Sequence, residues 1–376
     1  MPHNLKARLS RYRDNPGAKE NPKIGSSSEV WSGWTEAGFK TLKRTIVREL
    51  SSPVPHTFSP ALAILVPDLL RLQRIPKPEE LLFFDLETTG LSGGAGTLAF
   101  LAAFGRFAVG SKSSSARLEI TQYLLLDYPG ENDFVELVLK EFSSNPLVVS
   151  YNGKSFDAQI LNMRCLMNRI PPPILSHADL LHPARRLWKR LLADCSQSSI
   201  EVSALGLDRS GDISGAMAPD IWFSFLRSGE NSELLSVCEH NVKDITGLAH
   251  LFLAFEEIAQ KPLESRYGFD EGALALYWRK ILKKNPLLLG DVCTKNGQLL
   301  LERAANRGHT QALISVAIDA EWRLKDTVLA LKYTKSALAN SELPDKLRSE
   351  LEKRQKRLEE KIIIKRNKIP LGNLKT

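Results

Sequence analysis

The sequence predicts an α/β protein in which a mixed sheet, flanked by helices, precedes an all-α domain. Three apolar strand-like runs follow one another, separated by Gly-rich and Ser-rich turns, and the hydrophobic period then changes to that of helices. Beyond Pro262 only helical patterns remain. Because strands joined by short turns pair antiparallel, the three runs predict a meander within the mixed sheet.

The hydrophobic period and the residues that break helices and strands predict the bounds of the individual elements. The helix at 155–168 should end there, because the three prolines 171–173 cannot continue it. The run 147–150 is short, apolar and bounded by turn residues, which indicates a buried strand. The other predicted strands span 81–86, 97–109 and 118–126. The other predicted helices span 132–142, 183–192, 198–205, 219–227, 232–258, 271–284, 297–307, 310–321, 324–339 and 345–364.

These patterns divide the chain into four parts. Residues 1–28 are polar and basic, and we expect a disordered arm. Residues 29–78 mix short apolar clusters with five prolines, and we expect an irregular lead-in. The sheet and its helices should occupy 79–260, and a helical domain with a basic tail should occupy 261–376.

The net charge of +8 is distributed unevenly among these parts. Residues 1–78 carry +7, residues 79–260 carry −9 and residues 261–376 carry +10. Basic flanks around an acidic centre suit a polyanion such as nucleic acid, held near a site that binds cations. The alternative is that the flanks are solvated tails and helix faces.

Composition and cysteine usage exclude several protein classes. A content of 43% hydrophobic and 25% charged residues is typical of globular proteins. The longest apolar run, 98–104, is shorter than the roughly 20 residues that span a bilayer. The basic N-terminus lacks the apolar stretch of a secretory signal, and the four cysteines form no C-x-x-C pair. We therefore expect a cytoplasmic protein with no membrane partner.

The chemistry is concentrated in acidic residues at element ends. Asp85 and Glu87 end an apolar strand, and the period of two places them on one face, where divalent cations would offset their repulsion. Asp157 falls in the first turn of a helix, where it can also be an ordinary helix cap. His240 and Asp244 are four residues apart in a long helix and therefore share a face.

These residues form three motifs that resemble those of the DEDD superfamily of RNase H-like 3′–5′ exonucleases. The string from His177 to Trp188 also resembles the bacterial YprB-like branch, in which a nuclease core precedes a tetratricopeptide-like helical tail. The motifs are Asp85-x-Glu87-Thr88-Thr89-Gly90, Asn152-x-x-x-Phe156-Asp157 and His240-x-x-x-Asp244.

The resemblance implies a role for each matched residue. Two Mg²⁺ or Mn²⁺ ions would be held by Asp85, Glu87, Asp157 and Asp244. Backbone amides around Thr88 and Thr89 would hold the terminal nucleotide, and Leu91 would wedge against its base. Asn152 and Phe156 match the positions that contact substrate and pack the second motif.

The third motif departs from the superfamily pattern. The general base there is a Tyr four residues before the last Asp or a His five residues before it, whereas His240 stands at the tyrosine spacing. An imidazole is a suitable base for water, but a supporting or purely structural histidine is the alternative.

Arg185 and Arg186 belong to a basic segment that also contains Leu187 and Trp188. Such a segment can line a channel for a single strand by pairing phosphates and stacking bases. The alternative is an amphipathic helix with a basic outer face.

The sequence thus predicts a metal-dependent nuclease, a 3′–5′ exonuclease that hydrolyses phosphodiester bonds in single-stranded DNA or RNA. The rival prediction is a catalytically weak or inactive nuclease-fold scaffold that binds nucleic acid. In that case the helical tail would dock a partner protein such as a helicase.

Overall fold

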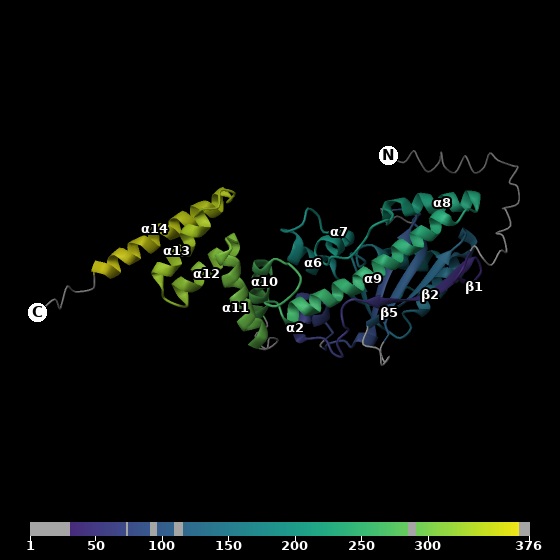
Figure 1. The fold of residues 1–376 in the computed structure, drawn as a ribbon, viewed down its shortest axis with the longest axis horizontal. Coiled ribbons are helices and arrows are strands. Elements are labelled where there is room, and N and C mark those ends of the chain that lie inside the picture. Colours follow the sequence, from purple (N-terminus) through teal and green to yellow (C-terminus); the bar gives the residue numbers. More distant parts are fainter. Residues whose placement is uncertain (1–30, 73, 91–95, 109–115, 285–290, 368–376) are drawn as a thin grey trace, which may run out of the picture.

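The computed structural model describes residues 31–72, 74–90, 96–108, 116–284 and 291–367 (Figure 1). The predicted disordered arm, 1–28, and the predicted wedge Leu91 lie outside the described residues. Among the helices of the described residues, none is both long enough and apolar enough to cross a membrane.

A mixed sheet of seven strands, counted over the described residues, has the order β1-β2-β5-β4-β3-β6-β7. The predicted meander is confirmed, because β3 (Leu81–Thr88), β4 (Ala99–Phe107) and β5 (Ala116–Leu125) pair antiparallel in sequence. On the other side of β3, β6 (Leu147–Ser150) runs parallel to it, and β7 (Ser176–Asp179) runs parallel to β6. The sequence does not reveal β7, because its four residues are mostly polar.

The expectation of an irregular lead-in over 29–78 is wrong for its first half. Two strands, β1 (Thr35–Gly38) and β2 (Thr41–Leu50), extend the sheet, and β2 pairs with β5 over all ten of its residues. β2 carries four charged side chains and is only partly buried, so it lacks the apolar signal of the central strands. A domain that began at residue 79 would lack both strands.

Two prolines of this segment start helices. Pro60 starts α2 (Pro60–Leu65) and Pro67 starts α3 (Pro67–Leu70). Proline suits the first turn of a helix, where its missing N–H would have no intrahelical partner. All residues of α2 after Pro60 are buried, and the helix packs against α9 (Ser232–Gln260).

The sheet separates two hydrophobic cores, and β3 contributes to both by alternation. Leu81 and Phe83 face a core that contains α2 and most of α9. Leu82 and Phe84 face the opposite core, which contains the side chains of three other helices. Those helices are α4 (Glu131–Lys140), α5 (Asp157–Met167) and α8 (Ala218–Ser228). Two further helices, α6 (Leu181–Trp188) and α7 (Gln197–Ser203), lie near α9 and α10.

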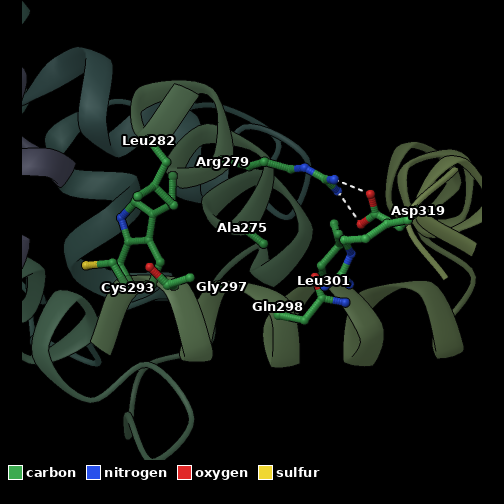
Figure 2. Close-up of a pocket in the computed structure, with 11 residues that line it drawn as sticks. Ala275, Arg279, Leu282, Cys293, Gly297, Gln298, Leu301 and Asp319 are labelled. Carbon is green, nitrogen blue, oxygen red and sulfur yellow. Dashed lines mark hydrogen bonds and ion pairs between the residues drawn. The ribbon is translucent and has the colours of Figure 1, made fainter. Parts of the chain in front are cut away.

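The chain after residue 262 is entirely helical in its described part, as predicted, and Figure 1 shows it extending away from the sheet. Each helix packs against the next along the chain. In a pocket between the first three of them, Arg279 reaches across to Asp319, as Figure 2 shows. Glu321 is buried and pairs with Arg354, Arg357 and Lys361 of the last helix. The helices are α10 (Glu271–Lys284), α11 (Asp291–Asn306), α12 (Thr310–Trp322), α13 (Thr327–Leu338) and α14 (Asp345–Asn367).

Gly105 of β4 lets α9 approach the sheet closely, and Gly105→Ala should displace that helix. A Cβ at this position would lie 2.6 Å from Cγ2 of Ile245, which directly follows Asp244. We expect a loss of about 1–3 kcal/mol in the free energy of unfolding, measured with urea, because the added methyl overpacks the contact. Gly268→Ala is the control, since its new Cβ would meet no atom within 4 Å. Equal stability of the two variants would contradict this account of the packing.

Candidate metal centre

Asp85 and Glu87 lie on the face of β3 that α9 covers. They continue the alternation of Phe83, which packs in the core beneath that helix. Oδ2 of Asp85 accepts a hydrogen bond of 2.7 Å from Nδ2 of Asn241 on α9. Glu87 is only 8% exposed and has no hydrogen bond or ion pair with any described residue. The strand end thus holds one anchored carboxylate and one buried carboxylate without a partner.

Asp157 is the first residue of α5, and it is buried at 4% exposure. Burial raises its pKa to about 7, although the backbone N–H groups of Asp157 and Leu86 favour the charged form. A cap exposed to solvent would show no such rise. The position therefore differs from that of an ordinary capping aspartate.

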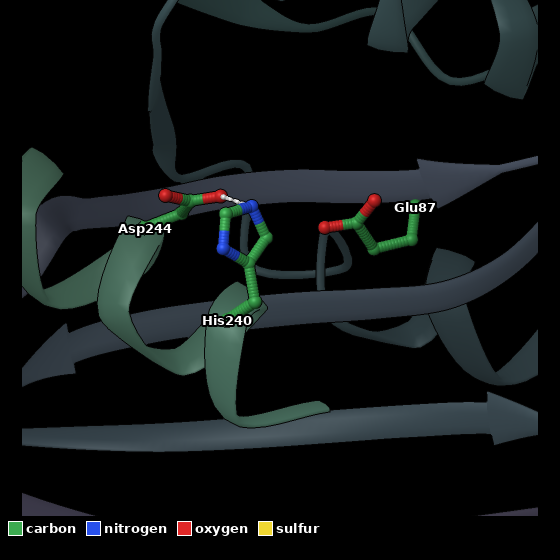
Figure 3. Close-up of side chains that lie close together, drawn as sticks. All are labelled: Glu87, His240 and Asp244. Atoms are coloured by element: carbon green, nitrogen blue, oxygen red, sulfur yellow. Dashed lines mark ion pairs between the residues drawn. The ribbon is translucent and has the colours of Figure 1, made fainter. Parts of the chain in front are cut away.

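The third group comes from α9, where His240 and Asp244 lie one turn apart. Nε2 of His240 is 3.3 Å from Oδ2 of Asp244. Together with Glu87 they offer three ligand atoms that all lie within 4.8 Å of one another, and Figure 3 shows the Glu87 carboxylate directed toward the other two side chains. The fold thus brings a strand residue and a helix pair, more than 150 positions apart in the sequence, to one point.

Electrostatic repulsion couples the four predicted acids. The pKa of Asp85 is raised well above its usual range by burial first, and then by the charges of Asp157, Asp244 and Glu87. Burial, followed by Asp244 and Asp157, likewise raises the pKa of Glu87. Each carboxylate therefore lies within the field of the others. A bound cation would relieve this repulsion most directly.

The donors of this centre fit divalent metal ions. They are carboxylate oxygens in a buried setting, which is the ligand type that Mg²⁺ and Mn²⁺ prefer. Asp85, Glu87 and Asp157 have no ion pair with any described Lys, Arg or His. The buried and unpartnered Glu87 is the clearest sign that a positive group belongs here.

Arg209 and Asp212 also belong to the centre, although they were not among the residues predicted from the sequence. Both come from the loop between α7 and α8, where Arg209 pairs with Asp244, Asp212 and buried Glu201. Burial alone would lower the pKa of Arg209, but these carboxylates raise it further than burial lowers it. Their surroundings, Asp208 to Asp212, have the polar composition of a turn. No sequence signal distinguishes them from a surface loop.

A chain of buried polar side chains supports Asp85 from behind. Asn241, which donates to Asp85, accepts through Oδ1 from Nε2 of Gln122 at 2.7 Å. Gln122 in turn accepts from Nε of Arg44 at 2.6 Å. Asn241 and Gln122 are fully buried, so their hydrogen bonds leave little freedom for reorientation. This chain runs from β2 through β5 and α9 to β3.

The predicted nucleotide-binding residues of the first motif are only partly available. The amide N–H of Thr89 donates to the carbonyl of Leu98 at 2.8 Å, which continues the pairing of β3 with β4. In this structure that amide is therefore occupied within the sheet, and a nucleotide contact by the amides around Thr88 and Thr89 stays a prediction. Oγ1 of Thr88 donates to the carbonyl of Gly90 at 2.9 Å, so this side chain supports the turn.

The second motif begins with a turn that Asp179 of β7 organises. Its carboxylate accepts from the amides of Asn152, Lys154 and Leu181. Asn152 has a φ of 64°, a left-handed conformation that asparagine tolerates better than most residues, and its side chain is exposed. Phe156 is half-buried against the core that contains α5. This turn sets the direction in which α5 presents Asp157.

Arg186 is not a free phosphate-binding residue, contrary to the expectation for this segment. Its guanidinium carbon lies 3.6 Å from the ring centroid of Tyr277 on α10, and its Nη1 donates to the carbonyl of Leu65 at 3.2 Å. Burial lowers its pKa. Arg186 therefore joins α6 to the helical part of the chain. Arg185 remains exposed on α6.

Comparisons with known proteins find a family model that covers the residues of this centre. Residues 82–255 match the RNase_H_2 family model, described as RNase_H superfamily. The uncharacterized protein YprB of Bacillus subtilis (strain 168) is 37% identical over 176 residues, which are 46% of this chain and 41% of YprB. The structure of the family B DNA polymerase from the hyperthermophilic archaeon Pyrobaculum calidifontis shows 13% identity and a TM-score of 0.36, over 70% of this chain and 34% of the polymerase chain.

Asp157→Asn should change how stability depends on pH when divalent ions are chelated. The pKa of Asp157 is about 7 in the folded chain against an ordinary 3.8, so the cost of ionising it is absent below pH 3.8 and complete above pH 7. The variant should therefore gain stability relative to wild type as the pH rises, by about 1–2 kcal/mol at pH 5 and up to about 4 kcal/mol above pH 7, at ~1.4 kcal/mol per pKa unit. Urea unfolding in EDTA measures this difference. A stability difference that does not vary with pH would contradict the buried position of Asp157.

Proposed function

Because residues 82–255 form an RNase H superfamily domain related to YprB of Bacillus subtilis, we propose that the protein is a metal-dependent nuclease. The observation that carries the proposal is the convergence of four mutually repelling carboxylates, one of which, Glu87, is buried and has no partner among the described residues. A site with only a structural role would gain stability by replacing such carboxylates with neutral side chains.

Under this proposal Asp85, Glu87, Asp157 and Asp244 hold two Mg²⁺ or Mn²⁺ ions. When bound, the ions supply positive charge that activates water and stabilises the leaving oxygen of the phosphodiester. The protein contributes orientation before substrate arrives. Asn241 fixes Asp85 through one oxygen, and Arg209 fixes Asp244 through Oδ1. In each case the second carboxylate oxygen stays available toward the centre.

We propose single-stranded nucleic acid with a free 3′ end as the substrate, and the resemblance of the three motifs to 3′–5′ exonucleases supports this choice. Asn152 is exposed beside the turn that leads to Asp157, and Arg185 is exposed on the neighbouring α6. Both can contact the sugar–phosphate backbone of a strand that enters the centre.

The second candidate function is a nuclease-fold scaffold that binds nucleic acid and a partner protein through α10–α14. One observation favours it: the end of the helical part exposes several large apolar side chains in proximity to cations. Exposed apolar surface of this kind often marks a protein contact. The exposed residues are Trp322, Leu324, Val328, Ile363 and Ile364.

Cleavage of end-labelled DNA and RNA strands with Mg²⁺ or Mn²⁺ separates the two functions. We expect wild type to shorten 5′-labelled single strands stepwise, and Asp85→Ala and Asp244→Ala to reduce the rate by ~10²-fold or more. Asp220→Ala is the control, because Asp220 is an exposed acid on α8. If wild type leaves every substrate intact with both metals, the nuclease proposal fails and the scaffold remains.

The exposed lysines of α14 should contribute to nucleic-acid affinity without touching the metal centre. Lys346, Lys353 and Lys356 are exposed and have no ion pair with a described residue, unlike Arg354 and its neighbours that hold Glu321. Replacing the three by Gln should weaken single-strand binding and lower the slope of log K against log salt by up to about 0.7 per lost contact. Fluorescence anisotropy over a salt series measures both.

Metal affinity should stay unchanged in the triple variant. The control is Glu352→Gln with Glu360→Gln, which removes exposed charges of the opposite sign from the same helix. Unchanged affinity and slope in the lysine variant would show that α14 is merely a solvated helix.

A further inference from the structure

Both ring nitrogens of His240 face carboxylates. Nδ1 lies 3.0 Å from Oδ2 of Asp212, and Nε2 lies 3.3 Å from Oδ2 of Asp244. The ring therefore stands between a loop residue on one side and the predicted metal ligands on the other. A general base needs a free nitrogen directed at water, whereas both nitrogens here lie at ion-pair distance from a carboxylate.

Glu87 supplies an independent reason to expect a ligand at this point. It is only 8% exposed, has no hydrogen-bond or ion-pair partner among the described residues, and points toward His240 and Asp244 in Figure 3. A buried, ionised carboxylate without a partner is strongly unfavourable, and a shared cation would balance it. The three ligand atoms lie within 4.8 Å of one another, close to the spacing of about 3–4 Å between ligands of one ion at bond lengths of about 2.0–2.2 Å.

Asp212 stands where an outer carboxylate stands beside a metal-binding histidine, although Nδ1 of His240 makes no hydrogen bond with a described residue in this geometry. Such histidines commonly donate one ring N–H to a carboxylate, which fixes the tautomer and directs the other nitrogen at the metal. Asp212 is itself held by Nη1 of Arg209 at 2.6 Å and lies 3.5 Å from Nζ of Lys243. Because Nδ1 lies beside Asp212, Nε2 is the nitrogen available to an ion shared with Glu87 and Asp244.

We propose that His240 is a metal ligand that joins Glu87 and Asp244 around one ion, with Asp212 as its positioning residue. This inference rests on the proposed function and gives His240 a role different from that of a general base. A nitrogen donor favours Mn²⁺, Co²⁺ or Zn²⁺ over Mg²⁺, which prefers an all-oxygen shell. The centre is therefore selective for the softer divalent ions at the position next to α9.

Pulsed EPR of the full-length protein loaded with Mn²⁺ tests the coordination directly. A ligating imidazole produces ¹⁴N modulation of the Mn²⁺ signal, whereas carboxylates and water do not. We expect this modulation in wild type and its loss in His240→Gln. His182→Gln is the control, because His182 is exposed on α6, and it should retain the modulation.

Metal titrations provide the second measurement. His240→Gln should weaken Mn²⁺ binding at least tenfold while changing Mg²⁺ binding less. Asp212→Asn should keep the ¹⁴N modulation but weaken Mn²⁺ binding by about 10–100-fold, as expected for an outer carboxylate. Circular dichroism spectra and melting curves identify any variant that has not folded, and the wild-type modulation tests the proposal without any variant.

The outcomes separate this inference from the nuclease proposal. Wild-type Mn²⁺ without ¹⁴N modulation, or unchanged modulation in His240→Gln, would overturn the ligand role even if the protein cleaves nucleic acid. Nitrogen-coordinated Mn²⁺ in a protein that cleaves nothing would support the ligand role while the nuclease proposal fails.

Discussion

Four carboxylates that repel one another, two of them buried, impose the main constraint on this fold. Burial and then the neighbouring acids raise the pKa values of Asp85 and Glu87, and burial raises that of Asp157, so the folded chain carries an electrostatic cost at neutral pH. The surrounding polar residues offset part of that cost. Asn241 anchors Asp85, and Arg209 anchors Asp244. Among the described residues Glu87 has no such partner, and a cation would balance its charge.

Helix α9 makes this arrangement possible because it belongs to both the core and the centre. One face packs over the sheet through residues such as Ile245, while the adjoining positions present His240, Asn241 and Asp244 to β3. Two glycines allow α9 to lie close to its neighbours. A Cβ on Gly105 of β4 would meet Ile245 of α9, and a Cβ on Gly247 of α9 would overlap Glu201 of α7. Packing of α9 and geometry of the centre therefore cannot vary independently.

Residues far from the acids complete their support. Arg44 on β2 reaches Asp85 through Gln122 and Asn241, so a strand near the edge of the sheet contributes to the orientation of a central carboxylate. The loop that carries Arg209 and Asp212 approaches from the other side and also contacts His240. The helical part of the chain is joined to this region by Tyr277 of α10, whose ring stacks on the guanidinium of Arg186 on α6.

The sequence by itself determined the features that depend on local pattern. The hydrophobic period and the turn residues predict the meander and the apolar strand that ends in Asp85 and Glu87. They also predict that Asp157 starts a helix and that His240 and Asp244 lie one turn apart. Tertiary structure alone decided the rest. Strand β2 is charged and half-buried, so only its pairing with β5 reveals it. The roles of Arg209, Asp212 and Arg44 depend on partners more than 25 residues away in the sequence. Such contacts produce no periodic pattern in the sequence, because the packed fold decides which residues meet.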